Sequence, residues 1–289
     1  MDKPFNVTIL QPAGYIYSAS LAEAAEYIHH SLLALGHASV LTTNQLDPTR
    51  INIVFCAHLL KPQELSWLPP DSIIFNSEQL DNRGGWYLES GAYQEILRRH
   101  FVLDYATCNL SRIPHERKAF IPFCFCDKLI RRNMKRKPGS ALVFYGIVTP
   151  RREKILKAIQ SHGVPVSVIT DTFGAKRDIQ MFKSWAILNL HNADDTRAFE
   201  QIRCFYPLIN GVPIISEASP EDASRAVFAD SVFFFDTADL PKACAGYYKA
   251  ADVFARETRL KLDAYRNGSG LPAIASALES YRKMPVSPV

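Results

Sequence analysis

The stretch that decides the fold begins with Ile187-Leu-Asn-Leu-His191, continues through Glu200-Gln-Ile-Arg203 and ends with Asn210-Gly-Val-Pro-Ile-Ile-Ser-Glu217. Its first part is a short apolar run, which is compatible with a buried strand. Apolar residues then recur at helical spacing until Asn210-Gly211, a pair typical of a helix C-cap, and a second β-prone run follows. The stretch therefore predicts a strand, a helix, a tight turn and another strand.

Polar residues fill the ends of these predicted elements. Asp194, Asp195 and Thr196 are residue types that cap helix N-termini, so we expect the helix to begin there. Glu200 and Arg203 are three residues apart and share one helix face. Open α/β sheets bind ligands at strand and helix ends of this kind. The pair has two interpretations, a ligand-binding pair or a solvated ion pair.

The same alternation of strand, turn and helix occurs throughout the chain. The first unit runs from a β-prone segment at residues 6–10 through a helical pattern that Gly36 ends, and it restarts at residue 141. The other predicted strands are residues 40–43, 51–57, 72–75, 101–105, 119–122, 164–169 and 231–235, and the other predicted helices are 93–99, 151–161, 177–185 and an interrupted run over 240–282. This pattern predicts an α/β protein with parallel, Rossmann-like sheets.

Length and composition favour two domains. The 289 residues are ample for two domains, and 47% hydrophobic with 21% charged residues is typical of a globular protein. We place the boundary near residue 137, where a basic segment meets Pro138-Gly139-Ser140 and no periodic pattern crosses. The predicted domains are residues 1–137 and 138–289, the second with a helical tail.

The basic segment before this boundary has two interpretations. The formal net charge of +4 is modest, which argues against a dedicated nucleic-acid binder. The segment is either a solvated linker or a contact for an anionic partner, such as a membrane surface or a polyanionic acceptor. Its cations are Lys128, Arg131, Arg132, Lys135, Arg136 and Lys137.

Neither a membrane span nor a secretory signal is evident. No apolar run has the length of a span, and Met1-Asp-Lys-Pro4 does not open a signal peptide, so we expect a cytoplasmic chain. The six cysteines lie in apolar contexts, and Cys124-Phe-Cys126 is too closely spaced for a usual zinc site. Buried free thiols are therefore expected.

Carboxylates follow two predicted strands in the first domain. Glu78 and Asp81 come after the strand at residues 72–75, and Asp104 lies at the end of the next strand. Carboxyl ends of parallel strands form the mouth of an open sheet, so Glu78 and Asp81 are candidates for a general base or for acceptor contacts. Capping of the following helix is the alternative.

Two arginines begin the first helix of the second domain. Arg151 and Arg152 lie where cations oppose the helix dipole. A diphosphate held between the helix N-terminus and these arginines would remove the conflict. Solvent exposure of both side chains is the other interpretation.

Together these segments resemble a known family. Phe144-Tyr-Gly-Ile-Val-Thr-Pro-Arg-Arg-Glu153, Thr172-Phe-Gly-Ala-Lys-Arg-Asp178 and Phe199-Glu-Gln-Ile-Arg203 resemble the C-terminal domain of bacterial GT-B glycosyltransferases. The most similar branch is the small chains related to spore-maturation-type, family 1-like transferases. Ile73-Ile-Phe-Asn-Ser-Glu-Gln-Leu80 in the first half resembles the same branch, and the resemblance covers residues 5 to 235.

The resemblance implies a fold and a reaction. It implies two Rossmann-like domains facing a central cleft, with C-terminal helices packing back. The second domain would hold a nucleotide-sugar donor and the first a glycan or other hydroxyl acceptor, in cell-surface polysaccharide biosynthesis. By the same resemblance, Gly146 and Arg151 approach the donor diphosphate, Glu200 contacts the donor sugar or ribose, and Arg203 helps bind phosphate. The other donor-binding candidates are Arg152, Phe173, Gly174, His191, Tyr206, Asn210 and Glu217; the catalytic candidates are Glu78, Asp81 and Glu200.

One position departs from the family pattern. Many GT-B enzymes carry a second glutamate after the one matched by Glu200, and alignment on the glycine turn puts Tyr206 there. Ribose recognition must then differ, and the stereochemistry stays open. An inverting reaction needs a base, for which Glu78 or Asp81 is preferred to Asp104. In a retaining reaction Glu200 would matter more, as an electrostatic partner of the donor sugar.

The chemistry expected from the resemblance needs no metal. No Asp-X-Asp motif stands in a metal-binding context, so we expect metal-independent transfer, with arginines stabilising the leaving diphosphate and no cofactor besides the nucleotide-sugar. Two other functions stay open. A non-catalytic nucleotide- or partner-binding protein on the same scaffold is suggested by the missing glutamate. A two-lobed periplasmic-type ligand binder is weakened by the missing signal sequence.

Overall fold

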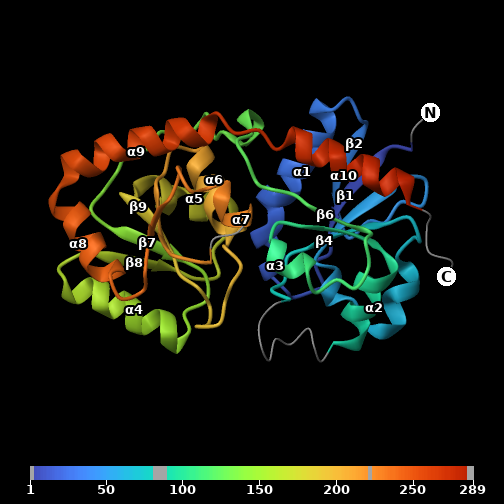
Figure 1. Ribbon diagram of the computed structural model, residues 1–289, viewed down its shortest axis with the longest axis horizontal. Helices are drawn as coiled ribbons and strands as arrows, with labels where there is room; N and C mark the ends of the chain where they lie inside the picture. Colours follow the sequence, from blue (N-terminus) through green and yellow to red (C-terminus); the bar gives the residue numbers. More distant parts are fainter. Residues whose placement is uncertain (1–2, 81–89, 221–222, 285–289) are drawn as a thin grey trace. The chain divides into compact units, whose positions relative to one another are not determined.

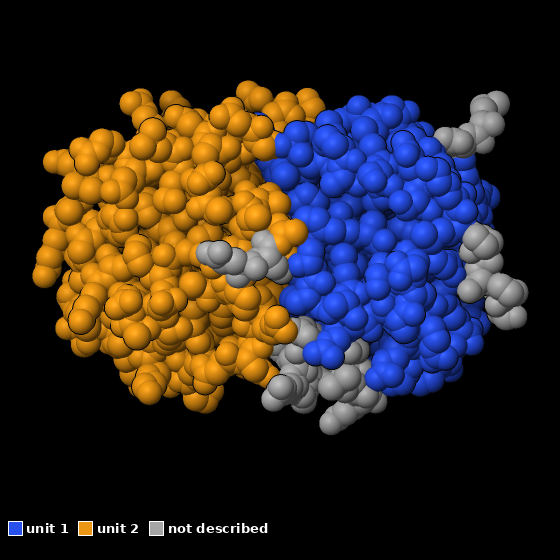
Figure 2. All heavy atoms as spheres, in the orientation of Figure 1, with its two compact units in different colours: residues 1–126, 269–289 blue, residues 127–268 orange. Residues whose placement is uncertain are grey.

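The computed structural model describes residues 3–80, 90–220 and 223–284. The chain forms two compact units, the first comprising residues 1–126 with 269–289 and the second residues 127–268 (Figure 2). Within the described ranges, no helix combines the length and the apolar character needed to cross a membrane.

The first unit is a six-stranded sheet flanked by helices, and all its strand pairs are parallel (Figure 1). The strand order is β2-β1-β3-β4-β5-β6. The strands are β1 (Phe5–Ile9), β2 (Ser39–Thr43), β3 (Ile51–Phe55), β4 (Ile73–Asn76), β5 (Phe101–Asp104) and β6 (Lys118–Phe120). The helices are α1 (Ala22–Ala34), α2 (Gly91–Arg99), α3 (Thr107–Leu110) and α10 (Leu271–Lys283), with 3-10 turns η1 (Tyr17–Leu21), η2 (Ala57–Leu59) and η3 (Pro62–Trp67).

The second unit is a five-stranded parallel sheet in the order β11-β10-β9-β7-β8. Its strands are β7 (Leu142–Tyr145), β8 (Val166–Ile169), β9 (Ala186–Asn189), β10 (Ile214–Glu217) and β11 (Phe233–Phe235). Its helices are α4 (Pro150–Ser161), α5 (Gly174–Lys183), α6 (Gln201–Ile209), α7 (Ala223–Ala226), α8 (Leu240–Lys249) and α9 (Ala251–Arg266), with the 3-10 turn η5 (Asp127–Leu129).

The inner strands are buried along their whole length, except β7, whose last residue Tyr145 is half-buried. Every residue of β1, β3, β4 and β5 in the first sheet and of β9 and β10 in the second is buried. Parallel strands covered by helices on both faces read as continuous apolar runs, which is why the sequence reveals them. The predicted α/β fold with parallel sheets is confirmed.

Helix α4 shows how local sequence fixes one of these elements. The hydroxyl of Thr149 at the N-cap accepts a hydrogen bond from the backbone N–H of Arg152 at 3.4 Å, and Pro150 occupies the first turn, where its missing N–H costs nothing. Ile155 and Ile159 on one face join the buried core of the second unit. That face fixes α4 against its sheet.

The unit boundaries differ from the sequence prediction at both chain connections. The basic segment belongs to the second unit, because the backbone N–H of Arg131 donates to Asn210 Oδ1 at 2.8 Å and that of Lys137 donates to the carbonyl of Phe182 at 3.1 Å. Helix α10 belongs to the first unit. Its Tyr281 hydroxyl donates to the carbonyl of Asp71 at 2.7 Å, and its ring packs on Phe101. The predicted boundary at residue 137 and the grouping of the whole tail with the second domain do not match these units.

The strand order defines one position in each sheet where ligands are expected. Successive strands of the second unit extend the sheet on one side of β7 and then on the other, so the connections reverse direction between β7 and β9. Loops diverge at such a reversal and leave a binding crevice outside the carboxyl ends of the strands. In the first unit the same reversal lies between β1 and β3.

Candidate functional site

The reversal in the second sheet is bordered by a glycine and an asparagine. Gly146 directly follows β7 with a φ of +133°, a conformation that side-chain-bearing residues rarely adopt. Asn189 is the last residue of β9 and is fully buried. Backbone can therefore approach a ligand closely on the β7 side.

Arg203 reaches this position from the first turn of α6. Its Nη1 donates to Asn189 Oδ1 at 2.7 Å and to the carbonyl of Leu190 at 3.3 Å. Its Nη2 lies 3.4 Å from where a Cβ atom would stand on Gly146. In the described part of the chain, Nε and Nη2 of Arg203 donate to no protein acceptor. A half-buried guanidinium thus has donors for an anion beside Gly146.

His191 adds a second polar group at the end of β9. Its side chain is buried, and its backbone N–H donates to Glu217 Oε2 at 3.0 Å. Burial lowers the pKa of the imidazole, although Glu217, whose Oε2 lies 3.9 Å from Nδ1, acts in the opposite direction. Nε2 is buried and finds no hydrogen-bond partner among the described residues. A neutral imidazole with an unpaired nitrogen is suited to a ligand hydrogen bond.

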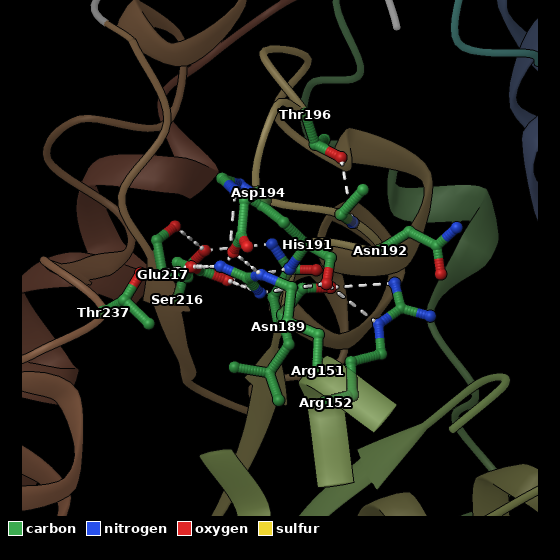
Figure 3. A network of polar contacts seen from close by, with 12 residues as sticks. Arg151, Arg152, Asn189, His191, Asn192, Asp194, Thr196, Ser216, Glu217 and Thr237 are labelled. Atoms are coloured by element: carbon green, nitrogen blue, oxygen red, sulfur yellow. Dashed lines mark hydrogen bonds and ion pairs between the residues drawn. The ribbon is translucent and has the colours of Figure 1, made fainter. Parts of the chain in front are cut away.

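Arg151 is paired inside the protein (Figure 3). Its guanidinium binds both carboxylate oxygens of Glu217, the Nη1 bond measuring 2.9 Å, and its Nε binds Asp194. Thr237 also donates to Glu217. Burial pushes the pKa of Glu217 upward, but the donors from Arg151, Thr237 and His191 outweigh it and bring this pKa to about 2. The Glu217 hydrogen bonds raise the pKa of Arg151.

Arg152 is buried against backbone carbonyls. Its Nε, Nη1 and Nη2 donate to the carbonyls of His191, Ile147 and Leu190 at 3.1, 2.8 and 2.9 Å. Burial, reinforced by the charge of Arg203, lowers its pKa to about 10, so it stays cationic at neutral pH. Carboxylates and carbonyls of the protein itself therefore offset the unfavourable interaction of Arg151 and Arg152 with the α4 dipole. Both arginines also hold the segment after β9 in place.

Glu200 lies at the N-cap of α6, so the predicted helix start at Asp194, Asp195 or Thr196 is wrong. The Thr196 hydroxyl instead accepts a bond from the N–H of Ala193 at 3.3 Å, within the loop. Glu200 is half-buried, and its negative charge acts to raise the pKa values of Arg152 and His191. Glu200 and Arg203 therefore do not lie on one face within the helix, contrary to the prediction. Glu200 occupies the N-cap of α6, and Arg203 lies in its first turn.

Tyr206, which the sequence resemblance aligns with a second glutamate, belongs to an internal network. Its hydroxyl donates to Asp178 Oδ2 at 2.7 Å and accepts from Arg131 Nε at 2.8 Å. The Arg177 guanidinium stacks on the Tyr206 ring at 4.9 Å. Asn210 is part of the same structural support, since its Nδ2 donates to the carbonyl of Leu129 at 3.3 Å.

Phe173 and Gly174 mark the start of α5. Phe173 occupies the N-cap in an extended conformation, and Gly174 has a φ of +56°. They follow β8, which neighbours β7 in the sheet. Both are therefore at the carboxyl edge of the second sheet.

The first unit has its own polar cluster at the carboxyl edge. Glu78 follows β4, and its Oε1 lies 3.3 Å from Nδ1 of His58, which follows β3. Burial lowers the pKa of His58, with an opposing effect of Glu78. Asp81 lies outside the described residues. Sequence reasoning missed His58, although its position just past a strand end was a usable signal.

A buried network positions Glu78. Asn76 Nδ2 donates to the Glu78 carbonyl at 2.8 Å and to Asp104 Oδ2 at 2.6 Å, and its Oδ1 accepts from the Tyr93 hydroxyl at 2.5 Å. Burial raises the pKa of Asp104 to about 7, against the hydrogen bonds it accepts from Asn76, Asn109 and the Ala106 N–H. Asp104 is thus a supporting residue beneath Glu78.

Two other sequence expectations can be compared with the structure. The basic segment is partly internal, since Arg131 binds Tyr206 and Arg136 Nη2 donates to the carbonyl of Trp185 at 2.8 Å, whereas Lys128, Arg132, Lys135 and Lys137 are exposed. The cysteines are free thiols, four of them buried.

In the described ranges there is no group of three or more His, Cys, Asp or Glu residues that could hold a metal ion.

Comparison with known sequences gives distant relatives. No family model matches the chain. Uncharacterized protein L137 of Acanthamoeba polyphaga mimivirus is 27% identical over 176 residues, which cover 57% of this chain and 23% of that protein. Uncharacterized protein L140 of the same virus is 27% identical over 185 residues, covering 61% and 57%. The chain thus spans under two thirds of these relatives, and the predicted bacterial, spore-maturation-type branch remains a prediction.

Comparison with solved structures defines the fold class. Anabaena Alr3699/HepE, in complex with UDP and glucose, aligns with a TM-score of 0.62 at 9% identity over 96% of this chain and 99% of its own. The avilamycin A glycosyltransferase AviGT4 aligns at 0.57 and 14% identity over 97% and 98%. The T4 phage BGT complex with UDP-glucose aligns at 0.53 and 11% identity over 96% and 97%. The chain has the two-domain α/β architecture of GT-B glycosyltransferases, which confirms the predicted fold class.

Proposed function

We propose that this chain is a glycosyltransferase that moves a sugar from a nucleotide-sugar donor to a glycan or other hydroxyl acceptor. The observation that carries the proposal is the position of Arg203, which presents two donors beside Gly146 at the reversal of the second sheet. Such a place in a doubly wound sheet suits a phosphorylated ligand. The GT-B architecture favours glycosyl transfer as the reaction, because the solved structures that share it are glycosyltransferases.

The second unit is proposed to bind the donor. A cation in the first turn opposes the dipole of α6, and a diphosphate beside Arg203 would remove this conflict. As the bond between sugar and diphosphate breaks, negative charge grows on the leaving group, and the Nε and Nη2 donors of Arg203 stabilise it without a metal. His191 Nε2 donates to or accepts from the donor, and Glu200 contacts its sugar or ribose.

Arg151 and Arg152 are proposed to act through the loop they fix. Arg151 connects Glu217 at the end of β10 to Asp194 after β9. Arg152 donates to the carbonyls of Leu190 and His191 in the same loop and to that of Ile147 after β7. Their part in donor binding is to keep His191 and Leu190 in place. Because Arg151 and Arg152 donate to acceptors within the protein, Arg203 is the one of these three arginines that is proposed to bind the diphosphate.

The first unit is proposed to bind the acceptor. In an inverting transfer the acceptor oxygen bonds to the anomeric carbon, the bond from that carbon to the diphosphate breaks, and the hydroxyl proton passes to Glu78. Glu78 suits this role because it follows β4 and lies beside the imidazole of His58. The exposed cations Lys128, Arg132, Lys135 and Lys137 are proposed to help a cytoplasmic enzyme approach an anionic acceptor or membrane surface.

The cheapest test is a nucleotide panel in a thermal-shift assay. A nucleotide that binds the folded state raises the melting temperature by mass action. Uridine diphosphate comes first because the HepE complex contains UDP and the T4 complex UDP-glucose. We expect at least one nucleoside diphosphate to raise the melting temperature, and a panel of uridine, guanosine, cytidine and thymidine diphosphates without any shift would refute the proposal.

The alternative is a non-catalytic protein that binds a nucleotide or partner on a GT-B scaffold. It is favoured by Tyr206, whose hydroxyl is engaged with Asp178 and Arg131 where the family has a ribose-binding glutamate. The two functions differ in product formation. A bound sugar nucleotide that stays intact with every acceptor offered would favour the alternative.

A further inference from the structure

A cavity of about 290 Å³ lies within the second unit, and none of its lining residues belongs to the candidate donor site. Its lining includes Gly139, Trp185 and Pro213, which stand just before β7, β9 and β10 respectively. The cavity is therefore at the amino ends of the strands, whereas Gly146 and Asn189 are at the carboxyl ends. Four-residue strands separate the two edges by about 13 Å. The cavity is thus distinct from the candidate donor site.

The cavity is lined by the aromatic side chains of Trp185, Tyr247, Tyr248 and Phe254. Trp185 packs against Phe254 with ring centroids 4.9 Å apart and against Tyr248 with centroids 5.9 Å apart, and all three line the cavity. Small-molecule pockets are mostly apolar and have volumes of roughly 300–1,000 Å³. The cavity is close to the lower end of this range, which suits a molecule with one or two rings.

Three polar atoms on lining residues lack hydrogen-bond partners in the part of the chain that the structure describes. They are Trp185 Nε1, Thr258 Oγ1 and Arg136 Nε, all buried. Trp185 and Thr258 are only 8% and 7% exposed. Buried polar groups are nearly always paired, so unpaired atoms on three residues around one cavity indicate an occupant with acceptor atoms.

The charge of Arg136 narrows the chemistry. Its Nη2 donates to the carbonyls of Trp185 and Ser184 at 2.8 and 3.3 Å, and no ion pair of the described residues includes it. The cavity is lined by no carboxylate from those residues. A partly buried cation without a counter-ion favours an anionic ligand.

We propose that this cavity is a binding site for a small aromatic carboxylate, with its ring against Trp185 and Phe254 and its carboxylate beside Arg136. The aromatic lining residues favour a ligand with a ring, and the guanidinium of Arg136, which has no counter-ion among the described residues, favours a ligand with a negative charge. Trp185 Nε1 and Thr258 Oγ1 offer hydrogen bonds to the remaining acceptor positions.

The test is calorimetric titration of the full chain with indole-3-carboxylate and with its neutral amide. Ala255→Phe fills the cavity from an exposed position on α9, whereas Val253→Phe is a matched control on the same helix that does not line it. We expect the carboxylate to bind the wild type at least tenfold more tightly than the amide. Ala255→Phe should lose at least tenfold in affinity, and Val253→Phe should keep it.

Several results would overturn the inference. They are equal affinities for the carboxylate and the amide, unchanged affinity in Ala255→Phe, or no binding of the carboxylate to the wild type. Displacement of indole-3-carboxylate by uridine diphosphate would place both ligands in one site and would also contradict it. Failure of the nucleotide panel alone leaves the cavity's expected behaviour unchanged, so the two proposals are separable.

Discussion

Nη2 of Arg203 lies 3.4 Å from the position that a Cβ atom would take on Gly146, so the loop after β7 and the start of α6 meet at one point. In Gly146→Ala the new methyl group would occupy the space beside the guanidinium, and the φ of +133° would be strained by about 1–3 kcal/mol. We expect nucleotide affinity to fall about tenfold, together with a lower melting temperature.

Gly163→Ala is the matched control for the backbone strain. Gly163 has a φ of +83°, and a methyl group added there would have no neighbouring atom within 4 Å. The substitution should lower the melting temperature and leave nucleotide affinity unchanged by calorimetry. Equal loss of affinity in both variants would show that strain, and not the approach to Arg203, governs binding.

The Glu217–Arg151 pair predicts a pH dependence at the acid end. The folded-state pKa of Glu217 is about 2, below its usual 4.5, so its stabilisation is complete above pH 4.5 and is lost as the pH falls toward 2. The shift corresponds to on the order of 3 kcal/mol. In urea unfolding over this range, Glu217→Gln should lower stability and flatten its rise with pH. Exposed Glu153→Gln is the control, and a wild-type slope in Glu217→Gln would contradict the assignment.

Asp104 predicts the opposite trend in a higher window. Its folded-state pKa is raised from 3.8 to about 7, so its favourable contribution is complete below pH 3.8 and is lost as the pH rises through 7. Asp104→Asn keeps an acceptor for Asn76 or the Ala106 N–H and removes the titration. Its stability by urea unfolding should vary less between pH 4 and 7 than that of the wild type. An identical pH profile for the two proteins would refute this.

Glu78 and Glu116 offer a test of the proposed base. Glu78 lies beside His58, whereas Glu116 is exposed in the same unit. Since a positioned base contributes about 100-fold or more, Glu78→Gln should lower kcat by that factor while the KM for the donor changes little. Glu116→Gln should behave as the wild type in the same assay of nucleoside-diphosphate release. A parallel loss in both, or a change confined to KM, would exclude Glu78 as the base.

The fold was predictable because buried parallel strands are visible in the sequence as apolar runs. The strands around residues 187–190 and 212–215 appear as β9 and β10, within the usual uncertainty of their ends. The partner of α10 was not predictable, because an apolar helix face does not specify which sheet it covers. The start of α6 was missed since Asp194 binds Arg151, a residue 43 positions away.

The site was only partly predictable for the same reason. The resemblance to GT-B transferases made Gly146, His191 and Arg203 candidates, and its position after a predicted strand made Glu78 one. Which arginine keeps donors for a ligand depends on acceptors that other strands bring, such as Glu217, 66 positions from Arg151. Sequence spacing carries no information about such pairs.

The most direct measurement is calorimetric titration of the best nucleoside diphosphate from the panel into the wild type, Arg203→Gln and Arg259→Gln. Arg259 is exposed on α9, so its substitution removes the same charge from the same unit without touching Gly146. Loss of charged hydrogen bonds predicts an affinity about 10- to 100-fold weaker in Arg203→Gln and unchanged in Arg259→Gln. Equal affinity of Arg203→Gln and the wild type would contradict the account.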